Sequence, residues 1–180
     1  MELYCGRPAD CAGRLAKEVR TYDLLDALGI SYFRTDHVPA DTMEHCREID
    51  ACLGVTICKN LFLCNRQRTS WYLLAMPGDK PFHTRELSGQ LGIARLSFAP
   101  PEDMERLLDI TPGSVSVMGL ANDRENAVRL LLDADLRGSA WFGCHPCINT
   151  SSLKLRTADL LDVFLPAVHH APTEVRLTGE

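Results

Sequence analysis

Two adjacent polar residues, Lys59 and Asn60, begin an otherwise apolar segment that ends at Cys64. A lysine ammonium directed into a pocket can hold a phosphate or stabilise negative charge that develops on an oxygen atom. Asn60 would add hydrogen-bond donors and an acceptor beside it. The same pattern also fits a lysine at a strand end whose aliphatic stem covers the core while its head reaches water. Spacing alone leaves both interpretations open.

A second group of chemically capable residues is Cys144-His145-Pro146-Cys147. A Cys-x-x-Cys pair is typical of a redox dithiol or of half a zinc site. The redox role needs the motif after an early strand and at a helix start, whereas this motif lies late in the chain. The zinc role needs a second ligand pair, and the cysteines from Cys46 to Cys64 recur every six residues, which is not zinc-ligand spacing. We interpret the eight cysteines mostly as reduced thiols, and His145 as either a pocket wall or an ordinary loop histidine.

Several familiar catalytic signatures are missing from the sequence. It has no Gly-rich phosphate loop, no His-Glu-x-x-His zinc helix and no Gly-x-Ser-x-Gly nucleophile motif. The sequence therefore implies neither a metal nor an organic cofactor.

Composition and charge exclude several classes of protein. The 180 residues are 46% hydrophobic and 24% charged, which is typical of one folded domain rather than a collagen, a coiled coil or a disordered chain. The net charge of -5 argues against a protein that coats nucleic acid non-specifically, but not against an enzyme that holds one end of an RNA. The longest apolar stretch, from Trp71 to Met76, is too short to span a membrane. With no signal-peptide pattern, we expect a cytoplasmic protein that binds neither membranes nor DNA.

Local patterns predict the elements that must position these residues. Helical spacing from Leu15 ends at Gly29, and Asp41 with Glu44 has the spacing of a capping box for a helix that starts near Thr42. Further helices are predicted over 84–92, from 101, and from Thr157 to before Pro166; strands are predicted over 30–36, 59–64, 70–76, 115–120, 127–132 and 141–144. Segments 59–64 and 70–76 should form a hairpin, and the tail after residue 170 should be loosely held. The irregular order of elements predicts a mixed α/β fold on one largely antiparallel or mixed sheet.

Four blocks of the sequence, taken in order, resemble the YbaK-like prolyl-tRNA editing family, and most closely its free-standing alanyl-tRNA(Pro) deacylases. The resemblance covers residues 20–167. The blocks are His37-Val38-Pro39 with Thr42; Lys59-Asn60-Leu61-Phe62-Leu63; residues 95–99, 111–116 and 119–123; and His145-Pro146 followed by Asn149-Thr150. The resemblance implies an editing domain over 20–167, preceded by an extension over 1–19 and followed by a tail over 168–180. It also implies a mixed, partly barrel-like sheet flanked by helices.

The activity that this resemblance implies is hydrolysis of mischarged alanyl-tRNA(Pro). A synthetase pocket built for proline cannot firmly exclude the smaller alanine, since small apolar differences give only about 1–3 kcal/mol of discrimination. The implied partners are the mischarged tRNA and, in addition, prolyl-tRNA synthetase. An aminoacyl ester is already activated, so the family needs no covalent nucleophile and is thought to use a positioned water and the terminal-ribose hydroxyl.

The resemblance also implies roles for single residues. Lys59 would support the terminal phosphate or ester oxygens, Asn60 would fix the adenosine, and His145 would lie beside the amino acid. The substrate-binding set would comprise Thr42, Ser114, Ser116, Val117, Gly119, Asn149 and Thr150. Arg66 and Arg68 lie after the strand of Lys59 and could contact the acceptor stem, or could simply be solvated loop charges.

Two departures from the family pattern concern amino-acid specificity. In the family, proline commonly follows Gly-Ser-Val-Ser, whereas here Val117 follows it and Met118 comes next. Cys147 and Ile148 occupy positions between His145-Pro146 and Asn149 that vary in the family. Serine or cysteine is therefore an alternative to alanine. Two other classes stay open: a non-catalytic module that binds aminoacyl-tRNA or a related ligand as a regulator, and a redox protein that uses Cys144 and Cys147.

Overall fold

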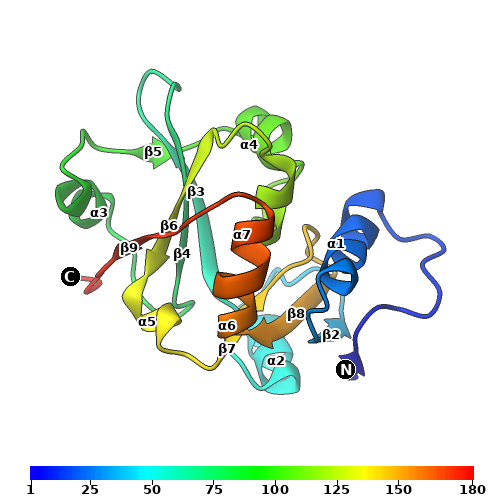
Figure 1. Ribbon diagram of the computed structural model, residues 1–180. Coiled ribbons are helices and arrows are strands. Elements are labelled where there is room, and N and C mark those ends of the chain that lie inside the picture. The colour runs from blue at the N-terminus through cyan, green and yellow to red at the C-terminus, as the bar shows by residue number, and fades with distance from the viewer.

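The computed structural model describes all residues from 1 to 180 and has two β-sheets with helices packed around them (Figure 1). In chain order the elements are β1 (Tyr4–Cys5), α1 (Ala16–Ala27), β2 (Tyr32–Asp36), α2 (Met43–Leu53), β3 (Lys59–Cys64), β4 (Trp71–Met76), α3 (Thr84–Leu91), β5 (Ser97–Phe98), α4 (Pro101–Leu108), η1 (Val117–Asn122), β6 (Val128–Asp133), α5 (Ala134–Arg137), β7 (Trp141–Cys144), β8 (Ser151–Arg156), α6 (Thr157–Asp159), η2 (Leu160–Phe164), α7 (Leu165–Ala167) and β9 (Thr173–Val175). The predicted mixed α/β class is confirmed.

The prediction of a single sheet is wrong, because the strands divide into two sheets. The first has the order β1-β2-β8-β7 and is antiparallel; the second has the order β5-β3-β4-β6-β9 and is mixed, with β6 parallel to both neighbours. Neither sheet closes into a barrel, so the expected barrel-like character is not found. In Figure 1 the first sheet lies beside α1 and α2, whereas α3 lies on the opposite side, against the second sheet. The main core contains buried residues of both sheets and of η2 and α7.

A backbone junction joins the two sheets. Ile57, just before β3, forms a parallel bridge with Gly143 of β7, and the Cys58 amide donates to the Gly143 carbonyl at 3.0 Å. A Cβ atom on residue 143 would lie 3.1 Å from side-chain atoms of both Ile57 and Val55, which is tighter than normal packing. Glycine at this position therefore lets the start of β3 lie against the end of β7.

Several predicted elements are confirmed, although Thr42 caps α2 in place of the expected capping box of Asp41 with Glu44. Helix α2 is capped by Thr42, whose hydroxyl accepts from the His45 amide at 3.2 Å, and it ends at Gly54 with a φ of 67°. The predicted hairpin is formed by β3 and β4, in a register that pairs Lys59 with Met76 and Cys64 with Trp71. These elements depend on signals that lie close together in the chain, which is why the sequence predicts them.

Three predictions of secondary structure are wrong. Residues 117–122 form a short 3₁₀ helix instead of a strand, because the Ser116 hydroxyl caps it by accepting from the Met118 amide at 3.1 Å. The last helix contains the π-helical stretch η2 and then continues past Pro166, which lies in the first turn of α7, where its missing N–H costs little. The tail is not loose, since β9 pairs with β6 and both Val175 and Leu177 are buried. Strand β8 was not predicted at all.

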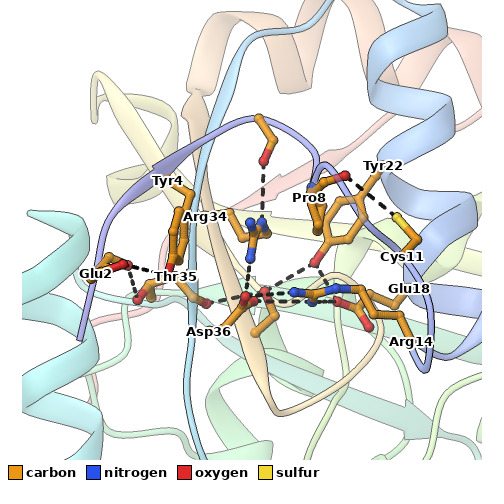
Figure 2. Close-up of polar contacts among 12 residues, drawn as sticks. Glu2, Tyr4, Pro8, Cys11, Arg14, Glu18, Tyr22, Arg34, Thr35 and Asp36 are labelled. Atoms are coloured by element: carbon orange, nitrogen blue, oxygen red, sulfur yellow. Dashed lines mark hydrogen bonds and ion pairs between the residues drawn. The ribbon is translucent and has the colours of Figure 1, made fainter.

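The N-terminal segment is held against the first sheet by a polar network (Figure 2). Arg14 donates to Asp36 at 2.8 Å and also pairs with the buried Glu18, while Arg34 pairs with Asp36 and donates to the Gly6 carbonyl. Burial opposes the charge on Asp36, but the two arginines outweigh it and lower the pKa of this carboxyl group to about 2. The network therefore stays charged and intact at neutral pH.

Gly119, one of the predicted substrate-binding residues, packs against the core and does not line the pocket described below. It lies in η1 against the end of α4, where an added Cβ atom would be 2.5 Å from Ile110 Cδ1 and 3.2 Å from Leu108 Cβ. The close approach that its lack of a side chain permits is to the core. None of the helices has both the length and the apolar character that crossing a membrane requires.

We expect Gly119→Ala to lower the free energy of unfolding by about 1–3 kcal/mol, because the methyl group overpacks the contact with Ile110. Urea denaturation measures this change. Gly89→Ala is the matched control: Gly89 lies in α3, where an added Cβ atom would meet no other atom within 4 Å. Alanine there should stabilise the protein by about 0.5–1 kcal/mol. Equal effects of the two substitutions would contradict this account of Gly119.

Candidate active site

A pocket of about 590 Å³ opens between α2, the start of β3, the turn after β4 and the loop between β7 and β8. It brings together Lys59 from one predicted block of the sequence with His145 and Asn149 from another. The other lining residues are Ala40, Asp41, Met43, Cys46, Arg47, Ile49, Asp50, Thr56, Ile57, Gly78, Asp79, Gly113 and Ser152. The volume is within the range of small-molecule sites.

Lys59 is the first residue of β3 and is half-buried in the wall of this pocket. Its Nζ atom donates to the Lys80 carbonyl oxygen at 2.7 Å. A lysine ammonium has three N–H donors, so two remain for a ligand. The backbone contact restrains the ammonium while leaving it able to bind an anion or an ester oxygen.

His145 follows β7 and also lines the pocket. Its Nδ1 atom lies 3.1 Å from the Ser151 carbonyl oxygen, which can only accept, so Nδ1 carries the proton in the neutral ring. Nε2 is then an acceptor. Burial lowers the pKa of His145, the contact with the Ser151 carbonyl opposes this, and the charge of His37 lowers it further. The ring is therefore kept neutral at physiological pH.

Asn60 does not line the pocket beside Lys59. Successive side chains of a strand point to opposite faces, so the two neighbours cannot both face the same cavity. The Asn60 amide donates to the Cys58 carbonyl at 3.2 Å and to Cys58 Sγ at 3.1 Å, and its Oδ1 atom is buried without a partner. In this structure Asn60 braces the start of β3.

Three more of the predicted substrate-binding residues do not line the pocket. Ser116 is fully buried, and its hydroxyl donates to the His145 carbonyl at 2.6 Å. Ser114 bonds within its own turn, to the Thr111 carbonyl at 3.2 Å, and Val117 is buried in the main core. The departure from the family pattern at Val117 therefore lies in the core and not on the pocket surface.

The two threonines of the predicted set form hydrogen bonds with backbone amides and do not line the pocket. Thr42 caps α2, so it positions Asp41 and Met43, which do line the pocket. The Thr150 side chain is exposed, and its carbonyl accepts from the His37 amide at 3.0 Å. Of the substrate-binding residues predicted from sequence, Asn149 alone lines the pocket.

Arg66 and Arg68 lie in the hairpin turn at the opposite end of β3 from Lys59. The length of the strand separates them from the pocket by about 17 Å, at about 3.3 Å per residue. Arg68 also pairs with Asp103 at 2.9 Å and with Glu102 at 3.2 Å. Their predicted contact with tRNA stays a prediction, and the structure does not bring them to the pocket.

Sequence reasoning missed most of the charged lining residues. Arg47 and Asp50 lie on α2, and Asp79 lies in the turn after β4. Burial raises the pKa of Asp50, although its carboxylate accepts from the Ile57 amide at 2.9 Å. No motif marks these residues; only Asp41 carried a signal, as part of the capping box.

The thiols of Cys144 and Cys147 are buried. Burial raises the pKa of Cys144 well above its usual value and that of Cys147 to about 11. A redox dithiol needs an accessible thiolate, so these environments do not suit that role. No three potential metal-ligating side chains converge in the structure.

Comparison with known proteins identifies a matching family model and similar sequences. Residues 37–163 match the family model described as an aminoacyl-tRNA editing domain. The chain is 32% identical over 136 residues to the prolyl-tRNA editing protein ProX of Acetoanaerobium sticklandii, covering 76% of this chain and 83% of that protein. It is 31% identical over 160 residues to prolyl-tRNA synthetase associated domain-containing protein 1 of Danio rerio, covering 88% and 85% respectively.

Solved structures share the fold. A crystal structure of a candidate trans-editing enzyme for prolyl tRNA synthetase superposes with a TM-score of 0.66 at 15% identity, covering 91% of this chain and 98% of that one. The family model spans most of the chain and includes every residue of the pocket. The chain therefore belongs to the aminoacyl-tRNA editing domain family.

Proposed function

We propose that this protein is a trans-acting aminoacyl-tRNA deacylase that hydrolyses mischarged alanyl-tRNA(Pro). The observation that carries the proposal is the convergence of the Lys59 ammonium and the neutral His145 ring on one pocket. Membership of the editing family and the likeness to ProX support the reaction class and the tRNA. The expected domain over 20–167 contains the entire pocket.

The reaction is hydrolysis of the ester between the amino acid and the terminal ribose. Water attacks the carbonyl carbon, the bond from that carbon to the ribose oxygen breaks, and the ribose oxygen receives a proton. The products are the free amino acid and uncharged tRNA. Because the ester is already activated, the protein needs to position water and stabilise charge rather than form a covalent bond.

Lys59 and His145 have complementary roles in this scheme. The two free N–H donors of Lys59 stabilise the negative charge on the ester oxygens or hold the terminal phosphate. The Nε2 lone pair of His145 accepts a hydrogen bond from the substrate, at the amino group, the ribose hydroxyl or the attacking water. Asn149, on the loop that carries His145, contacts the ribose.

The apolar and acidic residues of the pocket support the proposed substrate. Its apolar wall, formed by Ala40, Met43, Ile49 and Ile57, suits a small side chain such as that of alanine. The acidic groups Asp41 and Asp79 suit the positively charged amino group of the substrate. The protein would meet its tRNA, and prolyl-tRNA synthetase, in the cytoplasm.

We expect Lys59→Ala to lower kcat/KM for deacylation by about 10²–10³-fold, because it removes a cation aimed at developing charge. Release of labelled alanine from alanyl-tRNA(Pro) measures this. Lys17→Ala is the control, since Lys17 lies on α1 outside the pocket and should leave the rate unchanged. Normal deacylation by the Lys59 variant would remove the central element of the mechanism.

Among alanyl-, seryl-, cysteinyl- and prolyl-tRNA(Pro), we expect the alanyl ester to be hydrolysed fastest and the prolyl ester to be spared. Differences of one small group should change kcat/KM by roughly 10–200-fold. A preference for serine or cysteine would replace alanine as the substrate and keep the reaction class. Binding of all four without hydrolysis would refute the enzyme and favour a regulatory binding module.

A further inference from the structure

A chain of polar contacts leads from His145 through Ser152, which also lines the pocket, to a second histidine. His145 Nδ1 lies 3.2 Å from the hydroxyl of Ser152, and this hydroxyl lies 2.9 Å from His37 Nε2. His37 Nδ1 in turn lies 2.7 Å from the Val38 carbonyl oxygen. The two imidazole rings are 6.4 Å apart, and Ser152 is fully buried next to both.

Two carbonyl groups determine the direction of every hydrogen bond in this chain. A carbonyl oxygen only accepts, so His37 donates from Nδ1 to Val38, and in the neutral ring its Nε2 must accept. The Ser152 hydroxyl therefore donates to His37 Nε2 and offers its lone pairs to His145. His145 Nδ1 is then the donor, which agrees with its contact with the Ser151 carbonyl.

We propose that Ser152 and His37 are positioning residues that hold His145 in the tautomer protonated at Nδ1, so that Nε2 presents a lone pair to the pocket. The inference rests on the proposed function, because the pocket-facing lone pair matters only if His145 contacts the substrate. In the opposite tautomer, His145 Nδ1 would place a lone pair against the lone pairs of the Ser151 carbonyl. Only the Ser152 hydroxyl could then donate to Nδ1, by giving up its hydrogen bond to His37, and Nε2 could no longer accept.

The sheet explains how residues so far apart in the sequence meet. Strands β2 and β8 are antiparallel, with Thr35 opposite Ser152 and Asp36 opposite Ser151. The next residue, His37, remains tied to this strand because its amide donates to Thr150. The contact therefore depends on the register of two strands, and Ser152 is held by the sheet rather than by a flexible loop.

Protonation of His145 should limit the reaction at low pH. The titratable and charged residues around the ring are His37 after β2, Asp41, Arg47 and Asp50 at α2, Lys59 on β3 and Asp79 after β4. Of these, His37 is the residue whose charge lowers the pKa of His145. Removing His37 should raise this pKa, so the acid limb of the rate profile should move to higher pH.

The test combines two variants with a spectroscopic readout. In Ser152→Ala and in His37→Ala we expect kcat to fall roughly three- to tenfold, the scale of one lost hydrogen bond, with KM unchanged. His37→Gln, whose amide oxygen can still accept from Ser152, should recover part of the loss. Nitrogen-15 NMR of histidine-labelled protein, with His145→Gln for assignment, should find His145 protonated at Nδ1 in the wild type. In Ser152→Ala, where the Ser151 carbonyl alone favours this tautomer, the fraction protonated at Nε2 should increase.

Ser88→Ala is the matched control, since Ser88 is also buried and its hydroxyl accepts from the Leu96 amide at 3.2 Å, but on α3. It should lose stability without a change in the pH profile or in the His145 signals. A wild-type His145 protonated at Nε2, or wild-type kcat and pH profile in both Ser152→Ala and His37→Ala, would overturn the inference. If the wild type hydrolyses no aminoacyl-tRNA, the proposed function fails, while the NMR spectra still decide the tautomer.

Discussion

The geometry of the pocket depends on the junction between Gly143 and the residues that precede β3. This junction is the backbone contact between the start of the five-stranded sheet and the end of β7 in the other sheet. Lys59 follows it directly on one strand, and His145 follows it on the other. A side chain at residue 143 would push the two strands apart, because backbone and side-chain atoms of 55–57 already fill the space. The distance between the cation and the imidazole is therefore set by a close contact of two backbones.

A second constraint holds the loop that carries His145. The loop leaves β7 and returns as β8, and side chains from other elements fasten it. The Ser116 hydroxyl holds the His145 carbonyl, and the Ser151 hydroxyl donates to the Thr35 carbonyl at 3.2 Å. The buried Tyr22 hydroxyl lies 3.2 Å from the same Ser151 oxygen and donates to Glu18 of the N-terminal network at 2.7 Å. Residues outside the pocket thus limit how far the imidazole can move, which is how a pre-organised site differs from a flexible loop.

The charges of the protein agree with binding of one end of an RNA. The whole chain has a net charge of -5, and the pocket that holds Lys59 also contains Arg47 and several carboxylates. Such a pocket is not a broad basic surface, which fits the proposed binding of a terminal nucleotide and its amino acid. The acidic groups favour a positively charged amino group, and Lys59 favours the ester and phosphate oxygens. The two kinds of charge can therefore orient an aminoacyl ester within one cavity.

Local signals in the sequence determined the elements with clear ends and the residue at the head of β3. The capping threonine and terminal glycine of α2 define its length, and the alternation of 59–64 and 71–76 defines the hairpin, because these signals act over a few residues. The four family blocks likewise identified Lys59, His145 and Asn149. These residues were predictable because their chemistry and order are visible without knowing their surroundings.

Only the tertiary structure decided which side chains face the pocket. Asn60 points away from it because neighbours in a strand alternate, and Ser116 and Gly119 serve packing because the apolar run 117–122 coils into a 3₁₀ helix inside the core. Arg68 is carried to the far end of the hairpin, where acidic residues of α4 neutralise it. Ser152 belongs to an unpredicted strand and reaches His145 and His37 through the register of β2 with β8. The contact between His37 and Ser152 joins residues 115 positions apart, and no pattern of neighbouring residues encodes it.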